Sequence, residues 1–254
     1  MPNPEIRSLP IAVRVYPQQL FGEMVSRSNT FWMEPPGILV IHTVARRDAR
    51  QKLLIGSYQF IESDRCREEG LFYGDLSSAE SRRLKKYTAQ HFANTDSRAR
   101  RLRVITQREF LKLLYELAYK ARCLVVGFNL PLHLSRLAFD SASARGFFAG
   151  GFSLGLWTYT DKKGRERPNK FRPRICVKHI DRKRSLIGFT ARNSPDQEDL
   201  IPEGSRSGEP KPGYRFPGHF LDLRTLGFAL ADEVFSLESA CAAFGVELGH
   251  QGAS

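Results

Sequence analysis

The chain has 254 residues, of which 41% are hydrophobic, so it is long enough to bury one large core or two small ones. Its formal net charge of +12 favours a polyanionic partner, either a nucleic acid or an acidic membrane surface. No apolar run approaches the roughly 20 residues that cross a bilayer. The N-terminus also lacks the succession of charged, apolar and small residues typical of a secretion signal. These features argue against a membrane or secreted protein and predict a cytoplasmic one.

The four cysteines are widely spaced and form no CxxC pair. Cys123 and Cys176 lie in apolar runs typical of strands, and Cys241 lies in a run typical of a helix. We therefore expect buried thiols in a reducing compartment rather than disulfides. The spacing also argues against a zinc site built from Cys66 and the other three.

The first part of the chain predicts a peripheral arm followed by a meander of strands. Residues 1–30 show no sustained periodicity, and we expect them to be peripheral or disordered, whereas residues 31–254 should form a single domain. The breaker Pro35-Pro36-Gly37 precedes the first strand. Close polar turns predict antiparallel pairing between neighbouring strands. The expected strands are Ile38–Thr43, Leu53–Ile61 and Gly70–Tyr73.

Two helices with clear start signals should follow the meander. Ser77 and Glu80 have the spacing of a capping box, and Thr106 and Glu109 repeat it. Apolar residues continue at helical spacing after each box, in the second case as far as Ala121. We interpret Arg98–Arg103 between the helices as a basic linker. The second helix leads into an apolar strand, Cys123–Gly127, an order that indicates an α/β sheet with a parallel part.

The second half predicts an antiparallel β insertion and a closing helix. The insertion should span residues 152–217 and end in a long exposed loop, Pro195–Pro217, rich in Pro, Gly and charge. A turn at Asp161–Gly164 should join its first two strands. Ser236 can cap a last helix that Gly245 would close. The expected elements are strands Phe152–Tyr159, Arg174–Ile180, Ser185–Thr190 and His219–Leu223, and helix Leu237–Phe244.

Three segments carry a resemblance to a known family. They are the strand Ile38–Ala45, the stretch Cys123–Asp140 with its Asn-Leu-Pro turn, and the motif Phe-Leu-Asp-Leu-Arg at Phe220–Arg224. Together they resemble the DEDD-type 3′–5′ exonucleases of the ribonuclease H-like fold, especially bacterial proteins related to the proofreading domain of family B DNA polymerases. The resemblance implies an α/β fold with a mixed sheet flanked by helices. Independently, the alternation of β-rich and helix-period segments predicts one sheet with helix Thr106–Ala121 packed on it. Its expected strands are Ile38–Thr43, Leu53–Ile61, Cys123–Gly127 and His219–Leu223.

The resemblance also implies that the catalytic carboxylates have been replaced. The family holds two divalent ions about 4 Å apart with a cluster of acids. Its Asp-x-Glu falls on His42 and Val44, and the acid of its Asn-x-x-Phe-Asp motif falls on His133. The fourth family acid, from a Tyr-x-x-x-Asp element, has no counterpart before Ser254. We therefore expect no catalytic metal cofactor, and Mg²⁺ or Mn²⁺ only if the site is rearranged.

Several polar residues near these motifs remain candidates. Asp48, Asp140 and Asp222 are acids in a register different from that of the family, and Asp222 is interpreted as structural. A transition-metal site of His42, His133 and Asp222 is chemically sensible because imidazole suits such ions. The other interpretation of each histidine is a hydrogen-bonded residue at a strand end. The alignment requires His42 and His133 to lie within about 12 Å, because the two ions of such a cluster are only about 4 Å apart.

Basic and aromatic residues supply candidate contacts to nucleic acid. Asn129 should bond backbone at the strand-to-helix turn, and in the family it would also face the substrate. Phe128, Trp157 and Tyr159 could stack on bases, or belong to the core. A basic hairpin could follow a phosphate backbone or form a solvated face. Its cations are Lys162, Lys163, Arg165, Arg167, Lys170, Arg172 and Arg174.

These features support three hypotheses. The first is a degenerate exonuclease-like domain that binds nucleic acid, in particular single-stranded DNA, without hydrolysing it. The second is an active metal-dependent 3′–5′ exonuclease whose site is rearranged or completed by a partner chain. The third is a scaffold subunit that binds proteins in a DNA-processing assembly.

Overall fold

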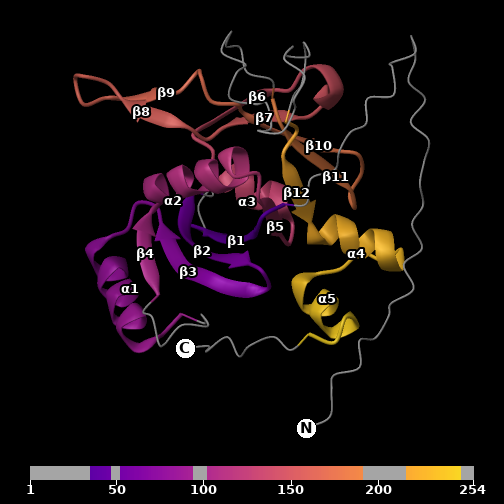
Figure 1. Ribbon diagram of the computed structural model, residues 1–254, viewed down its shortest axis with the longest axis horizontal. Helices are drawn as coiled ribbons and strands as arrows, with labels where there is room; N and C mark the ends of the chain where they lie inside the picture. The colour runs from indigo at the N-terminus through magenta and orange to yellow at the C-terminus, as the bar shows by residue number, and fades with distance from the viewer. Residues whose placement is uncertain (1–34, 47–51, 94–101, 191–215, 247–254) are drawn as a thin grey trace, which may run out of the picture.

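The structure is a computed structural model that describes residues 35–46, 52–93, 102–190 and 216–246 (Figure 1). The expected arm at residues 1–30, Asp48 and most of the loop Pro195–Pro217 lie outside the described residues. The described chain is an α/β protein with a mixed sheet flanked by helices.

Six strands form the main sheet in the order β12-β5-β1-β2-β3-β4. β2 runs antiparallel to both of its neighbours, whereas β5 is parallel to β1 and to β12, and β4 is parallel to β3. The four segments that were expected to share one sheet do so, which confirms that prediction. The strands of this sheet are β1 (Ile38–Ala45), β2 (Leu53–Glu62), β3 (Arg65–Tyr73), β4 (Arg103–Thr106), β5 (Leu124–Gly127) and β12 (His219–Asp222).

Alternation along β1 separates two faces of the sheet. Leu39 and Ile41 are buried in the main core together with Phe110 and Leu134, which lie on the helices above them. His42 and Val44 point to the opposite face and are exposed. Period-2 alternation with one buried face is the pattern expected for a strand whose second face is only partly covered.

Helices cover the two faces unequally. α2 (Gln107–Leu114), its π-helical continuation η1 (Tyr115–Lys120) and α3 (Leu130–Leu137) lie between the main sheet and a second sheet, while α1 (Ser78–Gln90) lies on the other side (Figure 1). Both predicted capping boxes are present, at the N-termini of α1 and α2. The prediction of a basic linker at Arg98–Arg103 is wrong at its last residue, because Arg103 is the first residue of β4. That strand is four residues long, too short for a periodic signal, and Arg103 is held by Glu68 on β3 at 2.7 Å.

The second sheet is antiparallel and has the order β11-β10-β7-β6. Its strands are β6 (Asp140–Ser143), β7 (Phe152–Gly155), β10 (Ile175–His179) and β11 (Ser185–Phe189), with the 3-10 turn η2 (Gly146–Phe148) between β6 and β7. The expected strand Phe152–Tyr159 is divided, because Leu156 and Trp157 are buried outside either sheet and the chain resumes as a separate hairpin. That hairpin consists of β8 (Thr158–Thr160) and β9 (Glu166–Pro168).

Two helices end the described chain. α4 (Leu223–Ala231) begins directly after β12 and had not been predicted, because the same apolar run carries both elements. α5 (Leu237–Ala243) has the predicted Ser236 cap and ends next to Gly245, which has a φ of 67°. All four cysteines are free thiols. Cys123 and Cys176 are buried as expected, while Cys241 is only partly buried.

Candidate functional site

The site begins where β5 stops and β1 continues. β5 pairs with β1 only through Leu124–Val126, so the following part of β1 has an open edge. The chain turns away at Gly127, where a Cβ atom would lie 3.1 Å from the Ile41 carbonyl oxygen and 3.1 Å from a Leu130 methyl carbon. Glycine therefore allows α3 to start close enough to fill the place of the missing strand.

His133 on α3 closes this open edge. The Thr43 N–H donates to His133 Nδ1 at 3.1 Å, and His133 Nε2 donates to the Phe128 carbonyl oxygen at 2.8 Å. A backbone N–H can only donate and a carbonyl can only accept, so these partners fix the neutral ring with its proton on Nε2. Burial, reinforced by the nearby His42 ring, lowers the pKa of His133 to about 4. The residue is therefore a neutral buried link between β1 and α3.

His42 lies against this link on the exposed face of β1. The two imidazole centroids are 4.8 Å apart, with their planes at 61°. The predicted proximity of His42 and His133 is therefore confirmed. Partial burial, with a smaller contribution from Arg136, lowers the pKa of His42, so its ring is neutral at neutral pH. Arg136 itself is held by the Thr43 carbonyl oxygen at 2.6 Å.

The acids near the motifs are engaged in structural contacts. Asp222 is buried and accepts hydrogen bonds from the Leu130 N–H at 3.0 Å and from the Thr225 hydroxyl at 2.8 Å, so it joins β12 to the starts of α3 and α4. Asp140 pairs with Arg174 at 3.0 Å. His133 uses both ring nitrogens in the bonds above, so the suggested site of His42, His133 and Asp222 has one imidazole with no free lone pair. Within the described ranges, no three His, Cys, Asp or Glu side chains are grouped to hold a metal ion.

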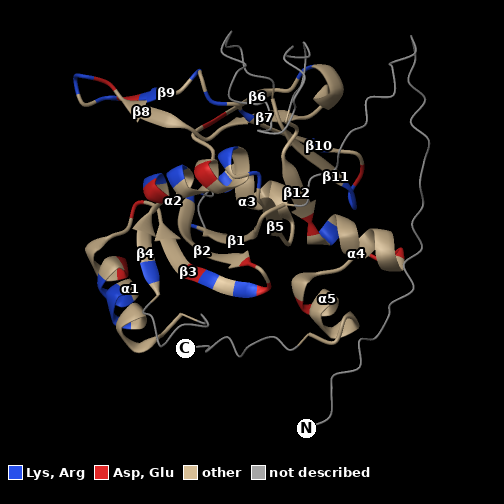
Figure 2. Cartoon of the chain, in the orientation of Figure 1, with Lys and Arg blue, Asp and Glu red and all other residues tan. Residues whose placement is uncertain are grey.

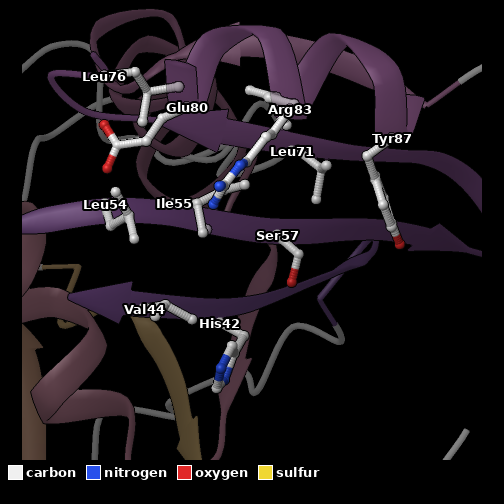
Figure 3. Close-up of a pocket in the computed structure, with 12 residues that line it drawn as sticks. His42, Val44, Leu54, Ile55, Ser57, Leu71, Leu76, Glu80, Arg83 and Tyr87 are labelled. Carbon is white, nitrogen blue, oxygen red and sulfur yellow. The ribbon is translucent and has the colours of Figure 1, made fainter. Parts of the chain in front are cut away.

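His42 and Val44 open onto a groove of about 460 Å³ between α1 and the second face of the main sheet (Figure 3). Its floor is mainly apolar. On the α1 side, Glu80 receives two hydrogen bonds from Arg46, each 2.9 Å long. The Arg46 guanidinium and the Ser77 backbone lower the pKa of Glu80 to about 2. The lining residues are His42, Val44, Leu54, Ile55, Gly56, Ser57, Leu71, Leu76, Glu80, Arg83, Leu84 and Tyr87.

α1 carries a cluster of cations that the sequence reasoning missed. Arg82, Arg83, Lys85 and Lys86 are exposed, and their side chains make no hydrogen bond or ion pair with any other residue in the described part of the chain. Arg83 lines the groove, whereas the other three lie outside its lining. Figure 3 shows the Arg83 guanidinium reaching from α1 into the space above β2. Two adjacent pairs of cations in a predicted helix with an apolar stripe are the signal that could have revealed this surface.

The predicted basic hairpin is largely occupied by its own contacts. Arg165 and Arg167 share the Asp161 carboxylate at 3.1 and 3.4 Å. Arg172 lies over the Tyr115 ring with its guanidinium carbon 3.9 Å from the centroid, and Arg174 is held by Asp140. Among these seven cations, only Lys162, Lys163 and Lys170 have side chains without a hydrogen bond, ion pair or ring contact to the described residues.

The remaining candidates divide between core and surface. Trp157 is buried and donates to the Pro173 carbonyl oxygen at 2.5 Å, so it is a core residue. Tyr159 is 49% exposed, and Phe128 is half-buried. Asn129 has a left-handed backbone with φ 62°, and its side chain makes no capping hydrogen bond, contrary to the expectation that it bonds backbone. It lines a second cavity on the other side of α3.

Comparison with known proteins gives no family for this chain: no family model matches it, and no curated protein is significantly similar to it. No helix within the described ranges is long and apolar enough to cross a membrane.

Proposed function

We propose that the protein is a degenerate, ribonuclease H-like relative of the 3′–5′ exonucleases that binds single-stranded nucleic acid and does not hydrolyse it. One observation carries the proposal. His42 and His133, 91 positions apart in the sequence, meet at 4.8 Å where the family alignment requires two catalytic acids to meet. The mixed sheet and its flanking helices agree with this assignment.

The chemistry of the two histidines supports binding without hydrolysis. A two-metal nuclease needs clustered carboxylates to hold its ions and to activate water. Here the corresponding positions hold two neutral rings and the valine Val44, so they supply no negative charge that would attract a cation or repel a phosphate. A mainly apolar groove, in which the acid Glu80 is paired with Arg46, is a suitable surface for bases whose phosphates contact the cations of the bordering helix.

The basic surface for this role is the exposed face of α1, with the free lysines of the hairpin as a second contact (Figure 2). Among these cations, Arg83 lines the groove together with the exposed Tyr87, whose ring is stacked on His91 with 3.8 Å between the centroids. Aromatic rings next to a cationic helix can hold successive bases by stacking while Lys and Arg contact the backbone.

The proposal is tested with labelled single-stranded DNA and RNA. We expect saturable binding whose affinity falls with salt, because each neutralised phosphate adds about −0.7 to the log–log slope on single strands. The labelled strand should remain intact with Mg²⁺ or Mn²⁺. Digestion from the 3′ end that stops with EDTA would establish the active-exonuclease alternative, and absent or salt-insensitive binding would favour the protein scaffold.

A further inference from the structure

A second cavity of about 650 Å³ lies between α3 and the four-stranded sheet. Its walls come from the side of α3 facing away from His133, from β6, β7 and β10, and from the first turn of α4. The volume is within the range of about 300–1,000 Å³ typical of small-molecule sites, which prefer junctions between structural layers. The lining residues are Asn129, Pro131, Leu132, Ser135, Ala138, Phe139, Asp140, Ser141, Phe152, Leu154, Val177, His179 and Arg224.

Three polar side chains of this cavity have no partner among the described residues. The guanidinium of Arg224 makes no ion pair there, and its Nε atom is buried without a hydrogen bond. The Asn129 amide is not used as a helix cap, and the His179 imidazole forms no hydrogen bond within the described ranges. A buried guanidinium N–H that lacks a partner is unfavourable unless a ligand or water accepts from it.

Two aromatic rings at the same cavity are exposed. Phe152 on β7 is 58% exposed, and Phe139, just before β6, is 46% exposed. The acid in the lining, Asp140, is neutralised by Arg174 at 3.0 Å, so the unpaired charge of the cavity is the cation of Arg224. An arginine together with exposed aromatic rings recognises ligands that combine an anionic group with a planar ring.

We propose that this cavity binds a nucleotide unit, a planar base that carries a phosphate. Arg224 binds the phosphate, Phe152 stacks on the base, and Asn129 and His179 supply hydrogen bonds to the base edge or the sugar. A free mononucleotide and the terminal nucleotide of a bound strand present the same chemistry. Binding of a strand's terminal nucleotide rests on the proposed function, whereas binding of a free mononucleotide does not.

The test is calorimetric titration of the full chain with the four ribonucleoside monophosphates. We expect at least one to bind with a Kd below about 1 mM, and expect adenosine and ribose 5-phosphate, each lacking one half of the ligand, to bind more weakly. Arg224→Gln should weaken binding about tenfold or more because a charge-assisted hydrogen bond is lost. Phe152→Ala should weaken it about tenfold through lost stacking.

Matched controls separate the site from general effects. Lys178→Gln removes one charge from β10 at a position that alternates with His179 and so faces away from the cavity. Phe171→Ala removes an exposed ring outside the lining. Both should bind as the unaltered protein does. Asn129→Gly removes the amide without strain at a positive φ, and it provides a variant that keeps the fold if Arg224→Gln unfolds.

Competition against a labelled oligonucleotide distinguishes the two sources. Displacement of the strand by the mononucleotide assigns the cavity to a strand end, and binding without displacement assigns it to a free nucleotide. Mononucleotide binding tests the cavity independently of strand binding. If a monophosphate binds but no oligonucleotide does, the proposed function fails and the assignment of the cavity is kept. The inference is overturned if none of the four monophosphates binds saturably. It is also overturned if Arg224→Gln, Phe152→Ala and Asn129→Gly all bind as tightly as the unaltered protein.

Discussion

The β8–β9 hairpin and helix α1 are both rich in Lys and Arg, but they differ in what those charges do. Asp161 holds two arginines of the hairpin, and Arg172, just after the hairpin, lies over the Tyr115 ring, so much of this positive charge is engaged within the protein. On α1 the four cations Arg82, Arg83, Lys85 and Lys86 have no partner in the described part of the chain. The comparison shows that the number of cations in a segment does not measure the charge that it can offer to a phosphate backbone.

The buried His133 joins β1 to the turn before α3, so His133→Ala should have the largest effect of the changes considered. It leaves the Thr43 N–H and the Phe128 carbonyl without partners and opens a cavity, and we expect a loss of about 4 kcal/mol in the free energy of unfolding. Denaturant unfolding measures it. The same change at the exposed His179, the last residue of β10, should be close to neutral. Equal effects of the two changes would contradict the structural role of His133.

The same link should make stability depend on pH. The pKa of His133 is about 4 in the folded chain, against an ordinary value of 6.5, so the unfolded chain binds a proton more readily. The contribution of neutral His133 to the free energy of unfolding is complete above pH 6.5. As the pH falls towards 4, roughly 3 kcal/mol of this contribution is lost. Unfolding curves of the unaltered protein and of His133→Asn should therefore converge over this interval. A constant difference between the two would show that His133 does not titrate in this way.

Changing the α1 cations should weaken nucleic-acid binding more than any change in the hairpin. With all four replaced by glutamine, we expect about a hundredfold lower affinity at 0.1 M salt and a log–log slope flatter by about 3. Glutamine is a good helix former, so α1 should persist, which circular dichroism can check. An unchanged slope would remove α1 from the interface and restore the hairpin as the principal surface.

Within the hairpin, free and paired cations should behave differently. Replacing Lys162, Lys163 and Lys170 by glutamine should lower affinity about tenfold, because these side chains are free to contact phosphates. Replacing Arg165 and Arg167 should change affinity less than about threefold, since both already bridge Asp161. Filter binding over a salt series measures both variants. If replacing the two arginines lowers affinity more than replacing the three lysines, ion pairing with Asp161 does not prevent the arginines from contacting phosphates.

Much of the architecture could be predicted from the sequence, and the reasons are local. Capping boxes at Ser77 and Thr106, and apolar runs bounded by turn residues, are signals contained in a few neighbouring residues. β4 was missed because its pairing with β3 is tertiary and its four residues carry no period. α4 was missed because one apolar run contains the end of β12 and the start of the helix.

The site was predictable only in part. The alignment of the motifs placed His42 beside His133, but nothing in the sequence shows that both nitrogens of His133 are used by β1 and by the turn before α3. The hairpin was favoured for its density of cations, whereas the pairing of Arg172 with Tyr115 and of Arg174 with Asp140 joins residues far apart in the chain. Availability of a side chain is a property of the tertiary structure.

Photocrosslinking tests the central claim most directly, because it locates the bound strand. A single-stranded oligonucleotide with photoreactive bases, bound to the full chain and irradiated, is digested, and the crosslinked peptides are identified by mass spectrometry. The account predicts crosslinks in the peptide of α1 that contains Tyr87, which is 47% exposed beside the groove. Crosslinks confined to the hairpin residue Tyr159, or none despite saturating strand, would contradict it.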